Sequence, residues 1–148
     1  MTDLPKSDLP KLGDFPAQDY DKLRYGDMDT QGHVNNAVFT TLLETGRTSL
    51  LSHPQINAWK NGAYAYVIAR LEVDYRAELV WPGLVHVGTG VKSIGKSSMV
   101  LEQALYQDEK CVATAQSVMV QVGKTSHRPE PITAATRAIL EGFLLKSP

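Results

Sequence analysis

The feature that most constrains the fold is a change of period between the two halves of the chain. Residues 36–52 place apolar side chains close to helical spacing, at Val38, Leu42, Leu43, Leu50 and Leu51. From residue 64 onward, β-branched and aromatic residues partly alternate with polar ones, as in half-buried strands. Since a helix and a sheet each need a partner for their apolar side, one helix lying on a sheet is the simplest arrangement.

Residue types at the ends of these segments set the expected boundaries. Asn35 or Asn36 can cap the helix at its start, and Pro54 disfavours helical geometry in the residue before it. Four strands are expected at 64–76, 85–91, 98–106 and 112–122, joined by turns in order as an antiparallel meander. A weaker strand pattern covers 18–25, and a short helix pattern covers 132–145. The fold class is therefore α+β.

Composition limits the classes of protein that fit. A length of 148 residues with 43% hydrophobic residues suits one domain, which we place at 17–148 after a flexible arm at 1–16. A net charge of -1 argues against nucleic acid as a partner. No apolar stretch approaches the roughly 20 residues of a membrane-spanning helix. The first residues lack the pattern of a secretory signal, and a single cysteine suits a reducing compartment, so a cytoplasmic location is expected.

Polar residues and glycines are densest between Tyr25 and Asn36, directly before the expected helix. The start of a helix presents backbone N–H groups without partners and a partial positive charge, which stabilise an oxygen that becomes negative during a reaction. Asp27 and Asp29 lie in this segment and are candidates for a base or a nucleophile. The alternative interpretation is that both aspartates only cap turns.

The same segment carries a family resemblance. Residues 24–39 read RYGDMDTQGHVNNAVF, and residues 43–47 read LETGR. These strings resemble the signature of the 4-hydroxybenzoyl-CoA thioesterase-like branch of the hotdog superfamily. The stretches VDY at 73–75, WPG at 81–83, GKSS at 95–98 and ATA at 113–115 are also similar, so the resemblance covers about residues 18–131. It implies a hotdog fold, in which an antiparallel sheet wraps one long central helix, and hydrolysis of acyl-CoA thioesters.

The resemblance also implies roles for individual residues. Asp29 falls on the catalytic carboxylate and the backbone N–H of Asn36 on the oxyanion donor, which leaves Asp27 a structural role. His33 is an alternative acid or base, although shaping the loop or lining the acyl pocket is the favoured role. Glu44 is a candidate for orienting the attacking water, and it could instead pair with Arg47, three residues along the helix.

Substrate binding is expected from five residues, which are Gly32, Val34, Asn35, Lys96 and Ser97. Lys96 is the direct match to the basic residues that hold coenzyme A phosphates in aromatic-acyl relatives. Ile94 and Gly95 stand where one relative has arginines, so Lys92 and Arg128 are candidate substitutes. The resemblance implies homodimers with active sites at the subunit interface, with homotetramers as a further option.

No cofactor is expected, since coenzyme A is part of the substrate. The histidines and Cys111 show no metal-ligand spacing, and Cys111 fits an inert core thiol. Two other functions fit the same residues: hydrolysis of thioesters on an acyl carrier protein, and a catalytically silent module that binds acyl groups. Asp29 could attack the thioester directly or take a proton from water, and the sequence is compatible with either route.

Overall fold

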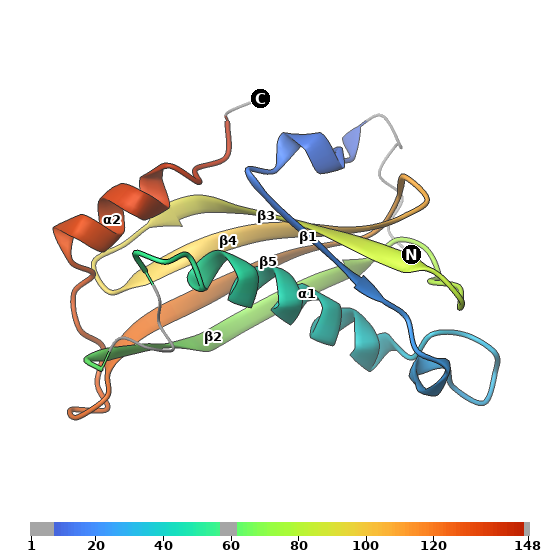
Figure 1. The fold of residues 1–148 in the computed structure, drawn as a ribbon, viewed down its shortest axis with the longest axis horizontal. Helices are drawn as coiled ribbons and strands as arrows, with labels where there is room; N and C mark the ends of the chain where they lie inside the picture. The colour runs from blue at the N-terminus through green and yellow to red at the C-terminus, as the bar shows by residue number, and fades with distance from the viewer. Residues whose placement is uncertain (1–7, 57–61, 147–148) are drawn as a thin grey trace.

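The computed structural model describes residues 8–56 and 62–146. It contains a five-stranded antiparallel sheet with one long helix packed on one face (Figure 1). The helix is α1 (Asn36–Leu51), and it packs mainly against β1, β3 and β4. The strands are β1 (Ala17–Lys22), β2 (Tyr64–Tyr75), β3 (Leu84–Ile94), β4 (Ser98–Gln107) and β5 (Lys110–Gly123). A short α2 (Ala134–Glu141) follows the last strand. The expected α+β hotdog architecture is confirmed.

The order of the strands corrects the expected meander. The order across the sheet is β1-β3-β4-β5-β2, so β2 pairs with β5 and not with β3, its successor in the chain. Tight turns join β3 to β4 and β4 to β5, whereas residues 76–83 carry the chain from one edge of the sheet to the other side. Strand β3 also continues to Ile94, because a register shift after Val91 keeps it paired with β4.

The core between α1 and the sheet has one cluster at each end of the helix. Leu23, Val34, Phe39, Leu43 and Leu79 belong to the cluster at the start of α1. Leu50, Leu51, Met99 and Ile132 belong to the cluster at its end. Between them, Gly46 lets the helix approach the sheet, since a Cβ there would lie 2.6 Å from the side chains of Gln103 and Thr89. The two ends of α1 are therefore separate environments.

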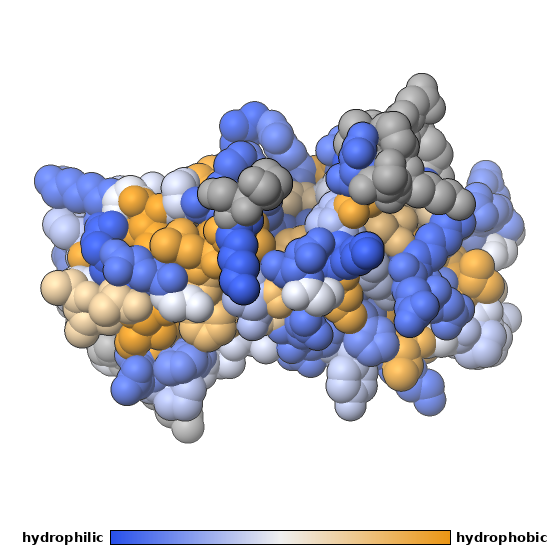
Figure 2. Space-filling model, turned by 90° about the horizontal axis from the view of Figure 1, so that it is seen from above, coloured by the Kyte–Doolittle hydropathy of each residue, from blue (hydrophilic) through white to orange (hydrophobic). Residues whose placement is uncertain are grey.

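The terminal segments differ from their expected form. Of the expected flexible arm, residues 1–7 lie outside the described residues, while residues 8–16 contact the sheet. Phe15 is buried against Gly88, and the carbonyl of Pro10 accepts a hydrogen bond from the Tyr106 hydroxyl at 2.5 Å. The Phe15 ring can pack here because Gly88 has no Cβ to clash with it. Figure 2 shows hydrophobic and hydrophilic residues interspersed on the face that carries the terminal segments.

The C-terminal helix is shorter than the predicted 132–145. Thr133 caps α2 by accepting a hydrogen bond from the Thr136 N–H, and the helix ends at Glu141 before Gly142. The backbone then pairs with β3, where the Val91 N–H donates to Phe143 O and the Leu145 N–H to Val91 O. Hydrogen bonds to the sheet thus replace the last helical turn. Within the described residues, no helix is long and apolar enough to cross a membrane.

Candidate active site

The candidate site forms where the loop after β1 leads into α1. Asn35 is the N-cap, since its Oδ1 accepts a hydrogen bond from the Ala37 N–H at 2.9 Å. Asn36 is then the first helical residue, and its backbone N–H has no hydrogen-bond partner among the described residues. An unpaired N–H at the positive end of a helix is suited to binding an oxygen that gains negative charge.

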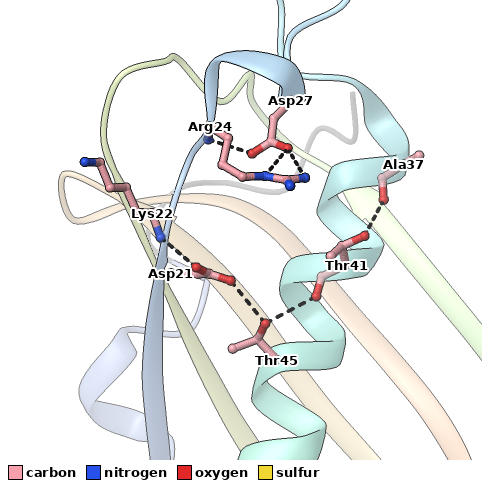
Figure 3. A network of polar contacts seen from close by, with 7 residues as sticks. All are labelled: Asp21, Lys22, Arg24, Asp27, Ala37, Thr41 and Thr45. Atoms are coloured by element: carbon pink, nitrogen blue, oxygen red, sulfur yellow. Dashed lines mark hydrogen bonds and ion pairs between the residues drawn. The ribbon is translucent and has the colours of Figure 1, made fainter.

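Asp27 is a buried anchor of this loop. Its Oδ2 accepts a hydrogen bond from the Arg24 N–H at 2.7 Å, and its Oδ1 lies 2.9 Å from Arg24 Nη2 (Figure 3). Burial alone raises the pKa of this carboxyl, but the hydrogen bonds and charge of Arg24 outweigh burial and lower the pKa. The carbonyl of Asp27 accepts a hydrogen bond from the Asn35 N–H at 2.9 Å. Asp27 therefore joins the start of the loop to the start of the helix.

Asp29 is exposed, and it both shapes the loop and presents a carboxylate oxygen to solvent. Its Oδ1 accepts hydrogen bonds from the N–H groups of Gln31 and His33, at 2.9 and 3.1 Å. Its backbone N–H donates to His33 O at 2.7 Å. In the part of the chain that the structure describes, its Oδ2 has no hydrogen-bond partner. Asp29 can therefore cap the turn through Oδ1 and still offer Oδ2 to a substrate or a water molecule.

His33 and Gly32 complete the turn. His33 Nδ1 lies 2.9 Å from Glu78 Oε1, so the imidazole contacts a carboxylate from the segment between β2 and β3. Gly32 has a φ of 81°, which side chains with a Cβ rarely adopt. The conformation of the loop therefore accounts for glycine at this position, and its predicted contact with substrate stays a prediction.

The other predicted residues near the helix take distinct places. Val34 is buried in the core cluster at the start of α1 and pairs with Met28 in an isolated bridge, so its side chain faces the core. Asn35 serves as the cap.

Glu44 is exposed on α1, about two turns along the helix from Asn36. Its charge acts on Arg47, which is buried and donates a hydrogen bond from Nη1 to Gln103 Oε1 at 3.3 Å. Burial lowers the pKa of Arg47, and Glu44 opposes that shift.

Lys96 and Ser97 lie at the opposite end of α1 from Asp29. They form the β3–β4 turn, where the Ile132 N–H donates to Lys96 O at 2.9 Å, and Ile132 packs with the end of α1. Figure 1 shows this turn beside α2, with the start of α1 at the other end. A helix of 16 residues spans roughly 24 Å, so one chain does not bring Lys96 to Asp29.

The two candidate substitutes for Lys96 have different surroundings. Lys92 Nζ lies 3.4 Å from Glu102 Oε1, so this cation already has an anionic neighbour. Arg128 is exposed in the loop after β5, where its carbonyl accepts a hydrogen bond from the Gly123 N–H. Arg137 of α2, which sequence reasoning overlooked, donates from Nη2 to Gly95 O at 2.7 Å and adds a cation beside the Lys96 turn.

Two contacts of the loop escaped sequence reasoning. Glu78 reaches His33 from 45 positions along the chain, and no local pattern links them. Arg24 stands three residues before Asp27, a spacing that could have suggested the ion pair.

Cys111 is half-buried, and burial raises the pKa of its thiol, which disfavours the reactive thiolate. Among the described residues, no three His, Cys, Asp or Glu side chains gather as metal ligands would.

A groove of about 1100 Å³ lies away from this loop. The β-strand residues Glu72, Glu102 and Gln116 line it from the sheet face opposite α1, together with residues 8–10 and 144–146 of the terminal segments. Five carboxylates line it against two cations, Arg76 and Lys146, so its net negative charge would repel the phosphates of coenzyme A. The groove is therefore unsuited to the expected substrate, and the loop before α1 remains the candidate site.

Comparison with known proteins agrees with this fold. The model of the thioesterase-like superfamily matches residues 23–140, and the chain belongs to this superfamily. A protein described as a predicted thioesterase from Bacillus stearothermophilus is similar, with 28% identity and a TM-score of 0.80, covering 89% of this chain and 98% of that one. No curated protein matches the chain.

Two further structures extend the comparison. A thioesterase from Thermus thermophilus, solved with coenzyme A and zinc, has 28% identity and a TM-score of 0.76, over 87% of this chain and 95% of that one. The PA5185 protein of Pseudomonas aeruginosa has 24% identity and a TM-score of 0.85, over 94% and 99%, and shows the shared fold. The family and the first two structures support thioester hydrolysis as the general activity.

Proposed function

We propose that this protein hydrolyses acyl-coenzyme A thioesters to a free acid and coenzyme A. The observation that carries the proposal is that one loop, held by hydrogen bonds, presents an exposed carboxylate oxygen of Asp29 and leads directly into α1, where the Asn36 N–H has no partner among the described residues. The Thermus thermophilus relative with bound coenzyme A supports the choice of acyl carrier. Hydrolysis of a panel of acyl-CoA thioesters, followed by a thiol-reporting reagent, tests it.

The chemistry follows from the two groups. The thioester carbonyl oxygen accepts a hydrogen bond from the Asn36 N–H, and the positive end of α1 stabilises the negative charge that develops on it. The Asp29 carboxylate either attacks the carbonyl carbon and forms an anhydride that water hydrolyses, or takes a proton from the attacking water. In both routes the thiolate of coenzyme A leaves and gains a proton.

A homodimer is part of the proposal. Strand β2 is an edge strand, and its Val67 and Ile68 are 46% and 45% exposed. An exposed apolar edge favours pairing with another strand, and a two-fold axis would pair β2 with the same strand of a second copy. Because that axis reverses the strand direction, the Asp29 end of one subunit would lie beside the Lys96 end of its partner. This arrangement would give each site a basic turn that its own chain holds at a distance.

We expect Ile68→Lys to weaken this dimer, because a charged side chain on an edge strand opposes pairing with another strand. Light scattering at micromolar concentration should show a smaller species than the wild type. Leu144→Lys is the matched control, since Leu144 is 41% exposed and lies outside the β2 edge. The same dimeric mass for both variants would move the interface away from β2, and a monomeric active wild type would remove the dimer altogether.

We expect Lys96→Ala to raise KM for acyl-CoA with little change in kcat, because the lysine would neutralise a phosphate remote from the reacting carbonyl. The difference in KM should shrink as salt is added. Lys92→Ala is a suitable control, since Lys92 is already beside Glu102. An unchanged KM for Lys96→Ala would place the phosphates elsewhere, and Arg137→Ala would then be the next variant to measure.

A further inference from the structure

Two exposed aromatic rings stack on each other beside the candidate loop. The rings of Tyr25 and Trp81 have centroids 5.2 Å apart and an interplanar angle of 28°. Tyr25 is 67% exposed and Trp81 37%, and Val80 and Leu84 next to them are 63% and 47% exposed. Large apolar side chains gathered on a surface indicate a place where a ligand or partner binds. We call the stacked pair of Tyr25 and Trp81 the aromatic platform.

The platform is held by the same segments as the candidate loop. Tyr25 opens the single-turn helix that ends with Asp27, the anchor of the loop. The Leu23 N–H donates to Gly83 O at 2.9 Å and ties the Tyr25 segment to the Trp81 segment. Glu78, in the segment that carries Trp81, contacts His33. A ligand on the platform would therefore adjoin the Asp29 loop.

The size and chemistry of the platform favour a planar ring as its occupant. Two side chains offer much less than the roughly 800 Å² per partner that a stable protein interface buries. An aromatic face binds a heteroaromatic ring by stacking, as in proteins that bind single-stranded nucleic acids. The side chain of Arg24, 81% exposed, lies next to Tyr25 in the chain and adds positive charge, although it also pairs with Asp27. Within an acyl-CoA, the adenine is a planar heteroaromatic ring that is present whatever the acyl group, and the ribose attached to it carries phosphates.

We propose that the adenine ring of coenzyme A stacks on the aromatic platform of Tyr25 and Trp81. This assignment rests on the proposed function and adds a binding contact for the nucleotide to it. The phosphate contact of the partner subunit's Lys96 and the stacking contact are separate, so each can fail without the other. The aromatic rings act in binding alone, since the chemistry belongs to Asp29 and the Asn36 N–H.

The kinetic test compares two substrates that share one acyl group. Trp81→Ala and Tyr25→Ala should each raise KM for the acyl-CoA about fivefold to fiftyfold, because stacking on a base contributes binding free energy of that order. The KM for the corresponding acyl-pantetheine, which lacks the adenosine, should stay at the wild-type value. Leu84→Ala is the control, as it removes an exposed apolar side chain without an aromatic face. Equal losses on both substrates, or none on the acyl-CoA, would overturn the proposal.

A binding test keeps this inference apart from the proposed activity. The chain has two tryptophans, so Trp59→Phe leaves Trp81 as the sole indole reporter. Adenosine 3′,5′-bisphosphate should quench its fluorescence in a saturable manner, and adding Tyr25→Ala should weaken that binding. This result would stand even if no acyl-CoA were hydrolysed. Absence of quenching, or a smaller oligomer for Trp81→Ala in light scattering, would overturn the assignment; the latter would indicate that a second copy covers the rings.

Discussion

Replacing Asp29 with asparagine is expected to lower kcat for acyl-CoA hydrolysis at least about a hundredfold while the fold and the proposed dimer persist. The amide oxygen of asparagine can still accept the hydrogen bonds that Oδ1 receives from Gln31 and His33, so the turn should survive. What is lost is the negative charge that makes the other oxygen a nucleophile or a base. Steady-state kinetics, with circular dichroism and light scattering on the same sample, measure this effect.

Asp27→Asn is the matched control in the same loop. Its carboxylate is buried against Arg24, so the variant should lose stability, because hydrogen bonds to charged groups contribute about 1.5–3 kcal/mol each. The lowered pKa of Asp27 means that its contribution is present above the unfolded pKa of about 4 and is lost as pH falls through the folded value. The melting temperatures of the wild type and of Asp27→Asn should therefore differ less in acid than at neutral pH. Greater loss of turnover for Asp27→Asn than for Asp29→Asn would show that the pair was assigned in the wrong order.

Local chemistry made the start of α1 predictable. Asparagines at 35 and 36, apolar residues at helical spacing and the preceding glycine-rich turn all act over a few residues, so the sequence predicted where the helix begins. It left the cap open between two asparagines. The structure resolves this, since Oδ1 of Asn35 bonds the Ala37 N–H, and that places Asn36 at the first helical position.

Long-range pairing made other features unpredictable from one sequence. A strand pattern does not specify its neighbour, so β2 was expected beside β3 although it pairs with β5. Glu78 reaches His33 only because residues 76–83 pass beside the loop on their way to β3. The contact between Phe15 and Gly88 was unpredictable for the same reason. The proline-rich composition of the first residues says nothing about a distant glycine in β3.

The distance between Asp29 and Lys96 means that one chain does not bring both residues to the same substrate molecule. Asp29 and the Asn36 N–H, the proposed reacting groups, lie in the loop at the start of α1, whereas the predicted phosphate-binding turn at Lys96 lies about one helix length away. A subunit that hydrolyses acyl-CoA alone would need further cations near the Asp29 loop, because Arg24, an exposed cation there, shares its charge with Asp27. The proposed two-fold pairing of β2 edges would resolve this conflict, because it would bring the Lys96 turn of a second copy beside Asp29.

Asn36→Pro is expected to fold and to lose roughly two to three orders of magnitude in kcat, because proline removes the proposed oxyanion donor while no hydrogen bond of the Asn36 N–H or side chain to another described residue is lost. Proline is favoured at the first position of a helix, where its N–H would have no helical partner. The preceding residue suits it, since Asn35 has a ψ of 137°, which lies in the extended range favoured before a proline and outside the helical range that a proline disfavours. The Asn35 cap on Ala37 is also untouched.

Asn36→Ala is the matched variant, because it removes the side chain and keeps the N–H. The cap belongs to Asn35, so Asn36→Ala should retain most of its turnover and most of its stability. Asn35→Ala should instead lower the free energy of unfolding by about 1 kcal/mol through loss of the cap. Circular dichroism confirms that each variant is folded before kcat is compared. If alanine at position 36 is as damaging as proline, the side chain carries the function, and the backbone N–H is not the oxyanion donor.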